Sequence, residues 1–233
     1  MMRKIVQITV ILLLGTMLSE SVHAQKYRKK EVALISFKLS INNDYRSKIE
    51  TFSSYFNEPN GKNVNRVDNQ ILYTAWDLIG EKLRNEVGML ILPLNAYGDK
   101  FSYDDYGFPD VGITKAMKKG LSKYYLKIDI EIGPEFSSKY ISFSQPDSAN
   151  QVIHLKDEEI KPKVTINLTI FSDKGIIPVA NCSGEAISGN IITLDKTFFD
   201  GIINNEVNPS QETLYNLLDK ASKKLIVSVY SNK

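Results

Sequence analysis

The sequence predicts an α/β (α+β) fold in which helices pack on a mixed β-sheet, and three observations carry this prediction. The chain opens with a strand, a long amphipathic helix and a second short strand, as in a parallel βαβ unit. Strands with antiparallel character follow, and a tight turn joins two of them. A second amphipathic helix closes the chain and supplies another apolar face to cover the sheet.

The opening strand is predicted over Glu31 to Ile41, where apolar side chains recur at every second position. One face of this strand carries five of them: Ala33, Ile35, Phe37, Leu39 and Ile41. The opposite face gains apolar character from Val32 and Leu34. An apolar character on both faces favours a central strand.

The predicted crossover helix runs from Ile71 to Val87. Its apolar positions recur at spacings of three and four residues: Ile71, Leu72, Ala75, Leu78, Ile79, Leu83 and Val87. Asp68 or Asn69 is the expected N-cap, and Gly88 stands where a C-cap glycine belongs. Residues 89–92 follow directly and are expected to form a short buried strand.

The second half of the chain predicts the antiparallel strands and the closing helix. Regular alternation marks strands at residues 124–132 and 163–171. A tight turn at Ser172 to Gly175 then leads into a partner strand at residues 176–186. The remaining predictions are a short helix at 113–119, an irregular stretch at 188–209 and a last helix capped by Ser210.

The N-terminus has the pattern of a secretory signal peptide. Two basic residues precede an apolar run of 14 residues, Ile5 to Leu18, which is shorter than the ~18 residues that indicate a membrane span. Cleavage is expected after Ala24, so residues 1–24 are removed and no stable membrane span remains. No cysteine lies near this point for lipid attachment. The mature chain is therefore expected to be periplasmic or secreted and not lipid-anchored.

Residues 25–233 are expected to form a single globular domain with insertions near residues 42–68 and 134–161. The whole chain has 29 basic and 27 acidic residues, a balance that by itself gives no indication of binding to nucleic acid or to an anionic membrane. Cys182 is the only cysteine, so no intramolecular disulfide can form. A buried, inert thiol is its expected role, since free cysteine is among the most buried residue types.

Five segments match the elements of a known α/β domain in order and in apolar pattern. They are the opening strand Val32 to Phe37, the first helix at 72–87, the strand at 124–133, the hairpin at 164–186 with its Asp173-Lys174-Gly175 turn, and the closing helix at 214–230. This pattern resembles the domain shared by the curli-secretion-channel protein, the amino-terminal domain of TolB and lipoprotein activators of penicillin-binding proteins. The resemblance implies a non-catalytic envelope protein that acts by binding partners. Many members are lipid-anchored, and this chain departs from them there.

The inventory of reactive residues excludes several familiar kinds of site. Once the signal peptide is removed, His154 is the only histidine, so the several His or Cys ligands of a zinc site are missing. The sequence contains no Gly-x-Ser-x-Gly elbow and no glycine-rich phosphate-binding motif. We therefore expect neither a metal nor a cofactor.

The loop from Asn95 to Gly112 combines aromatic and acidic side chains. Aromatic residues with a polar tip provide much contact area at small entropic cost, and loops on rigid scaffolds carry binding sites. The loop is thus predicted to be a recognition surface. Its candidate binding residues are Tyr97, Tyr103, Tyr106 and Phe108.

The same loop leaves one enzymatic alternative open. A glycosidase needs two carboxylates about 5–10 Å apart in a cleft, and Asp104 or Asp105 could pair with Asp110 for that purpose. Convergence of these acids with Glu135 would favour catalysis. We favour binding, because acidic surface loops are common.

The sequence therefore predicts an exported, non-catalytic envelope or periplasmic protein that binds an envelope protein or a glycan. A carbohydrate-active hydrolase that uses acids of the 99–110 loop is the alternative, and oligomer formation is left open.

Overall fold

The computed structural model describes residues 26–56, 59, 64–99, 101–135 and 161–232. The predicted signal peptide, most of the 134–161 insertion and His154 lie outside the described residues. The strands are β1 (Glu31–Ile41), β2 (Leu90–Ile91), β3 (Tyr124–Pro134), β4 (Pro162–Ser172) and β5 (Gly175–Ile187). The helices are α2 (Asn43–Glu50), α3 (Arg66–Lys82), α4 (Ile113–Lys119), α5 (Lys196–Asn204) and α6 (Leu214–Ser231), with short turns of helix at Ser53–Tyr55, Leu83–Val87 and Leu94–Tyr97.

These strands form one mixed sheet in the order β2-β1-β3-β4-β5. Strand β1 is parallel to β2 and to β3, whereas β3, β4 and β5 are successively antiparallel. The predicted fold class is therefore confirmed: a parallel βαβ entry and antiparallel exit strands share one sheet, with helices packed on it.

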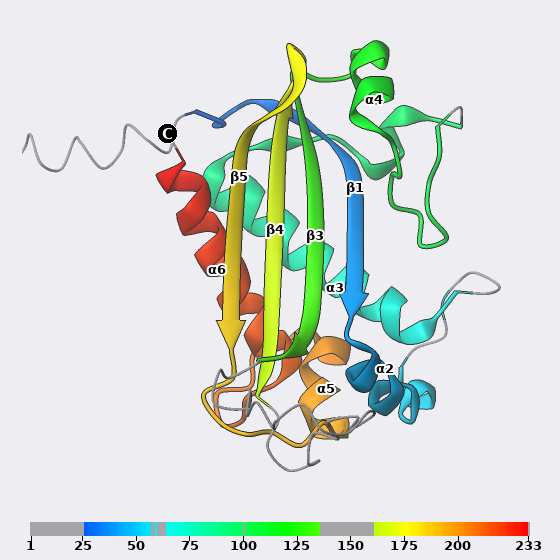
Figure 1. The fold of residues 1–233 in the computed structure, drawn as a ribbon, viewed down its shortest axis with the longest axis vertical. Coiled ribbons are helices and arrows are strands. Elements are labelled where there is room, and N and C mark those ends of the chain that lie inside the picture. Colours follow the sequence, from blue (N-terminus) through cyan, green and yellow to red (C-terminus); the bar gives the residue numbers. More distant parts are fainter. Residues whose placement is uncertain (1–25, 57–58, 60–63, 100, 136–160, 233) are drawn as a thin grey trace, which may run out of the picture.

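The two faces of the sheet are covered differently (Figure 1). Helices α3, α5 and α6 lie on one face and build the main core with the inward side chains of all four long strands. Of the described residues, α4 and the loop before it cover one end of the other face and enclose a smaller second cluster around Tyr97, Val111, Ala116 and Tyr125. Farther along that face, β3 carries polar side chains such as Lys127 and Asp129.

A β-bulge in β1 changes which face its side chains occupy. The pairing of β1 with β3 shifts register between Leu34 and Ser36. Before the shift, Ala33 and Ile35 belong to the second cluster, and after it Phe37 belongs to the main core. The prediction of one continuous apolar face from residue 33 to residue 41 is therefore wrong, because a bulge adds one residue and inverts the alternation.

Helix α3 begins earlier than predicted. The side chain of Asn65 accepts hydrogen bonds from the backbone N–H groups of Val67 and Asp68, so Asn65 is the N-cap and not Asp68 or Asn69. At the other end, Gly88 has φ 77° and closes the helical segment as predicted. The helix is buried as expected: Leu78 lies in the main core, and Trp76 packs against Phe37.

Strand β2 is shorter and more exposed than the predicted buried strand. It pairs with β1 only through Glu31 and Val32, and Leu90 is 53% exposed. Beyond Ile35, the part of the chain that the structure describes places no strand beside β1 on the β2 side. That free edge is where the candidate site lies.

The stretch before the last helix is more regular than predicted. Residues 196–204 form α5, whose N-terminus is capped by the Asp195 carboxylate, and the N-cap of α6 is Thr213 rather than Ser210. Cys182 is buried as predicted, and burial raises the pKa of its thiol. Among the described residues, no helix combines the length and apolar character needed to cross a membrane.

Helix α6 approaches the sheet closely at Gly184 of β5. A Cβ atom added there would fall inside contact distance of the Ala221 carbonyl oxygen and lie 2.9 Å from the Leu225 Cα atom, both in α6. Only a residue without a side chain lets α6 pack at this depth, because backbone atoms cannot rotate away.

We expect Gly184→Ala to lower the free energy of unfolding by about 1–3 kcal/mol, since α6 must shift outward. Urea unfolding followed by circular dichroism measures this loss. Gly189→Ala is the matched control, because no heavy atom lies within 4 Å of its added Cβ atom. Equal stability of the Gly184 and Gly189 variants would contradict the close packing of α6.

Candidate functional site

Residues 102–110 fold as a small hairpin that lies beside the free edge of β1 (Figure 1). Asp110 N–H donates to the Ser102 carbonyl at 3.0 Å, and Asp104 N–H donates to the Phe108 carbonyl at 2.9 Å. Gly107, with φ 84°, makes the reversal. Val111 N–H then donates to the Ile35 carbonyl at 2.9 Å, which attaches the loop to β1 next to the bulge.

The carboxylate of Asp104 organises this hairpin from inside. Its Oδ1 atom accepts hydrogen bonds from Tyr106 N–H at 3.0 Å and from Phe108 N–H at 2.8 Å. Burial raises the pKa of the Asp104 carboxyl; those two backbone bonds act in the opposite direction, and the nearby carboxylates of Asp110 and Asp105 raise it further. Asp104 therefore holds the shape of the hairpin, in addition to being one of the acids predicted for a site.

Two of the four predicted binding residues hold the loop in place. Phe108 is 0% exposed and packs in the main core against Phe37, with ring centroids 4.8 Å apart. Tyr97 is 3% exposed and packs in the second cluster against Phe101 at 5.2 Å. The predicted role of Tyr97 and Phe108 as contact residues is corrected accordingly, because side chains buried to this extent offer no surface to a partner.

The other two predicted binding residues are half-buried. The Tyr106 hydroxyl donates to the Asp68 carboxylate at 3.2 Å, and Tyr73 donates its hydroxyl hydrogen to the Tyr106 carbonyl at 2.7 Å. Burial, followed by the Asp68 charge, raises the pKa of Tyr106 to about 12. Tyr103 lies against the second cluster, and its hydroxyl oxygen is buried. Tyr106 thus lies toward Asp68 at the start of α3, whereas Tyr103 packs against the sheet.

A cavity of about 230 Å³ opens between β1, the start of α3 and this loop. Its apolar lining comes from Phe37, Leu39 and Leu72. Its polar lining is Lys38, Asp68, Asp104, Asp105, Tyr106 and Asp110. We call it the acid-lined cavity. All three acids of the predicted enzymatic alternative lie here.

Two of its four carboxylates have cationic partners. Arg46 of α2 donates to both oxygens of Asp68, at 3.0 and 3.1 Å, in a bidentate arrangement. Lys38 Nζ lies 3.2 Å from Asp110, with both side chains exposed. An exposed pair of this kind contributes at most ~1 kcal/mol, so a ligand can displace it at small cost.

The remaining acid singled out from the sequence lies elsewhere. Glu135 is 3.3 Å from Lys163 and lines a different cavity near the end of β3 and the start of β4. Within the described ranges, no three Asp, Glu, His or Cys side chains are arranged to hold a metal ion. Convergence is thus limited to the three loop aspartates, and Asp68 joins them.

Sequence reasoning missed Asp68, Lys38 and Arg46 as parts of this site. Asp68 was interpreted as a helix cap, and Arg46 stood in a segment with no assigned role. Lys38 lies between Phe37 and Leu39 in β1, and a polar residue between apolar ones is ordinary in a strand, so it does not indicate a site. Only the tertiary arrangement of β1, α2 and α3 brings these charges together.

No family model and no curated protein matches this chain. A hypothetical protein from Chlamydia trachomatis has a solved structure with a TM-score of 0.42 and 9% identity, covering 88% of this chain and 97% of the other. A putative neuraminyllactose-binding hemagglutinin homolog from Helicobacter pylori gives a TM-score of 0.33 and 13% identity, covering 88% of each chain. Similarities this weak carry no argument, and the resemblance to the curli and TolB domains stays a prediction.

We expect Asp104→Asn to become more stable relative to the wild type as the pH rises. The amide oxygen still accepts both backbone bonds but cannot ionise. Because the pKa of Asp104 is raised on folding, the folded state holds its proton more strongly, and ionisation costs stability. That cost is absent well below the ordinary pKa of 3.8, grows through the interval up to the raised value and is complete above it.

Urea unfolding of both proteins across this pH range measures the difference. Asp77→Asn, on the exposed side of α3, is the control for removal of one negative charge. A stability difference between Asp104→Asn and the wild type that falls with pH would contradict the inferred burial of the carboxylate.

Proposed function

We propose that this protein is an exported, periplasmic or envelope-associated binding protein that receives a cationic side chain of a partner in the acid-lined cavity. The observation that supports it is the convergence of Asp68, Asp104, Asp105 and Asp110 around a small opening with an apolar floor. Export rests on the signal-peptide pattern of residues 1–24, and an envelope partner rests on the resemblance described above.

The shape and chemistry of the cavity favour one kind of group. Its volume of about 230 Å³ is below the ~300–1,000 Å³ typical of small-molecule sites. Lysine and arginine carry an aliphatic stem that suits the apolar floor of Phe37, Leu39 and Leu72, and a charged head that suits the acids. A basic side chain displayed by a protein partner therefore fits better than a free metabolite.

Electrostatics also favour association with such a partner. Acidic rims attract basic surfaces from a distance and accelerate encounter, and the attraction weakens with salt. The hairpin that carries Asp104, Asp105 and Asp110 is fixed by Phe108 in the main core and by Val111 on β1. A rim that is already ordered loses little entropy on binding.

We expect labelled peptides of alternating lysine and serine to bind more tightly than peptides of alternating glutamate and serine, as measured by fluorescence anisotropy. Asp105→Asn with Asp110→Asn should weaken lysine-peptide binding roughly tenfold, since each exposed charge pair contributes up to ~1 kcal/mol. Asp77→Asn with Glu81→Gln removes the same charge from α3 outside the cavity lining and should leave the affinity nearly unchanged. Equal losses in both double variants, or no preference of the wild type for lysine, would refute the proposal.

The carbohydrate-active hydrolase is kept as a second candidate because of one observation. Asp104 combines a raised pKa with the nearby carboxylates of Asp110 and Asp105, and a glycosidase acid needs a raised pKa beside a second carboxylate. Against it, the two backbone hydrogen bonds accepted by Asp104 Oδ1 favour the ionised form of the carboxyl that would have to donate a proton.

For this candidate we expect hydrolysis of a panel of labelled oligosaccharides by the wild type and its loss in Asp104→Asn plus Asp105→Asn. The Asn substitution at residue 104 keeps the acceptor of the hairpin, so lost turnover would report chemistry rather than unfolding. If the wild type hydrolyses none of the panel, the hydrolase candidate is rejected and the binding proposal is kept.

A further inference from the structure

We propose that one end of the molecule binds the surface of a membrane that contains anionic phospholipids. This end is formed by the β4–β5 turn, the start of β3 and residues 26–30. We call it the basic apolar end, and it comprises Lys26, Lys30, Lys123, Lys174, Ile176 and Ile177. It shares no residue with the acid-lined cavity, so this inference goes beyond the proposed function.

The apolar part lies at the tip of a hairpin. Ile176 is 62% exposed and Ile177 is 79% exposed, and both follow directly on Gly175 at the turn. Val179, 37% exposed, extends the apolar surface along β5. Single exposed apolar residues are ordinary, but adjacent large ones at a protruding tip are typical of an interaction site.

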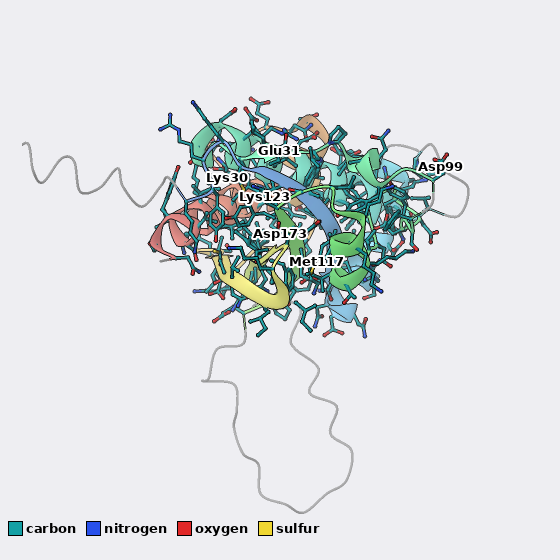
Figure 2. The ribbon with its side chains drawn as sticks, turned by 90° about the horizontal axis from the view of Figure 1, so that it is seen from above. Lys30, Glu31, Asp99, Met117, Lys123 and Asp173 are labelled. Atoms are coloured by element: carbon teal, nitrogen blue, oxygen red, sulfur yellow. The ribbon has the colours of Figure 1, made fainter. Side chains whose placement is uncertain are left out.

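The basic part surrounds a cavity of about 490 Å³ beside that tip. Four exposed lysines line it, and Asp173 is the one acid among its lining residues. Figure 2, which views this end from above, shows Lys30, Lys123 and Asp173 near one another. Asp173 N–H donates to the Lys123 carbonyl at 3.0 Å, so the turn that carries Lys174 is attached to the segment that carries Lys123.

Helix α4 adds charge at the same end of the molecule (Figure 1). Lys118 and Lys119 occupy its last turn and are exposed. Met117, half-buried, is also visible in the view from above (Figure 2). Lysines and exposed apolar side chains therefore lie at the same end of the molecule, an arrangement suited to anionic headgroups and to the acyl chains beneath them.

The segment that carries Lys26 and Lys30 is held against the folded domain. Tyr27 is buried against Tyr124, with ring centroids 5.6 Å apart, and Lys29 N–H donates to the Gly88 carbonyl at 2.7 Å. Lysines carried by an ordered segment lose little backbone entropy when they meet a charged surface.

Alternative occupants fit less well. A second copy of the chain would bring the same lysines against one another, and like charges oppose such contact. A soluble anion would use the lysines but not the exposed isoleucines. A membrane that contains anionic phospholipids offers negative charge to the lysines and an apolar interior to the isoleucines.

The test is cosedimentation of the mature chain, Gln25 to Lys233, which contains every described residue, with vesicles. One set contains phosphatidylglycerol and phosphatidylcholine in equal parts, and the other contains phosphatidylcholine alone. We expect binding to the first set, weakened by added salt, and little binding to the second. Each lysine near such a surface contributes about fivefold in affinity, so Lys123→Gln with Lys174→Gln should weaken binding roughly twentyfold.

The apolar contribution is tested with Ile176→Ser and Ile177→Ser together, which should weaken binding roughly tenfold or more because the inserted side chains are lost. Two control pairs lie outside the basic apolar end, on other elements. Ile191→Ser with Val207→Ser removes other exposed apolar side chains, and Lys48→Gln with Lys196→Gln removes the same charge from α2 and α5. Urea unfolding of each variant verifies its fold.

Three results would overturn the proposal. Wild-type protein that stays with the supernatant in both vesicle sets shows no membrane affinity. Control pairs that lose as much binding as the tip variants show that the effect is not local. A wild-type dimer in sedimentation velocity that Ile176→Ser with Ile177→Ser converts to a monomer, without vesicle binding, assigns the tip to a second copy.

Discussion

The β-bulge between Leu34 and Ser36 is the constraint on which the rest of the structure depends. It lets β1 contribute first to the second cluster and then to the main core, although the strand continues in one sheet. Without it, Phe37 would leave the main core for the opposite face, at a cost of ~1.5–3 kcal/mol. Phe108 packs on Phe37, so the loop that borders the acid-lined cavity would lose one of its two attachments as well.

Helix α6 packs along the opposite edge of the sheet, at β5, and its side chains bond to backbone groups of that strand. Strand β5 is a long edge strand, and such edges invite pairing with other chains. Ser183 N–H donates to the Ser228 hydroxyl, and the Asn232 side chain donates to the Asn181 carbonyl, so side chains near the end of α6 occupy backbone groups of β5. The same helix lies directly on Gly184. Ile176 and Ile177, at the turn end of β5, are the most exposed large apolar side chains of this strand.

The sequence predicts correctly the elements that follow from periodicity, and it does not predict the features that depend on close packing between distant segments. Regular alternation over β3 and β4, and the Gly88 cap, follow from local chemistry alone. The bulge has no local signal, so alternation was extended through it. Helix α5 was missed because Gly201 interrupts its pattern, and that glycine is required by a close approach to Tyr215 and Thr213. In the aromatic loop, Tyr97 and Phe108 have the composition of a recognition surface, yet the tertiary fold uses them as anchors.

The separation of charge within the domain links the two proposed surfaces. Strand β1 begins at Glu31, beside the basic apolar end, and reaches Lys38 at the acid-lined cavity (Figure 2 labels Glu31 and Lys30). Seven residues of strand at ~3.3 Å each place these points about 23 Å apart. Since charges are screened over ~8 Å at physiological ionic strength, anionic headgroups at one end would scarcely repel the acids at the other. A molecule held on a membrane by its lysines would therefore keep the cavity clear of the lipid surface, where a basic partner can reach it.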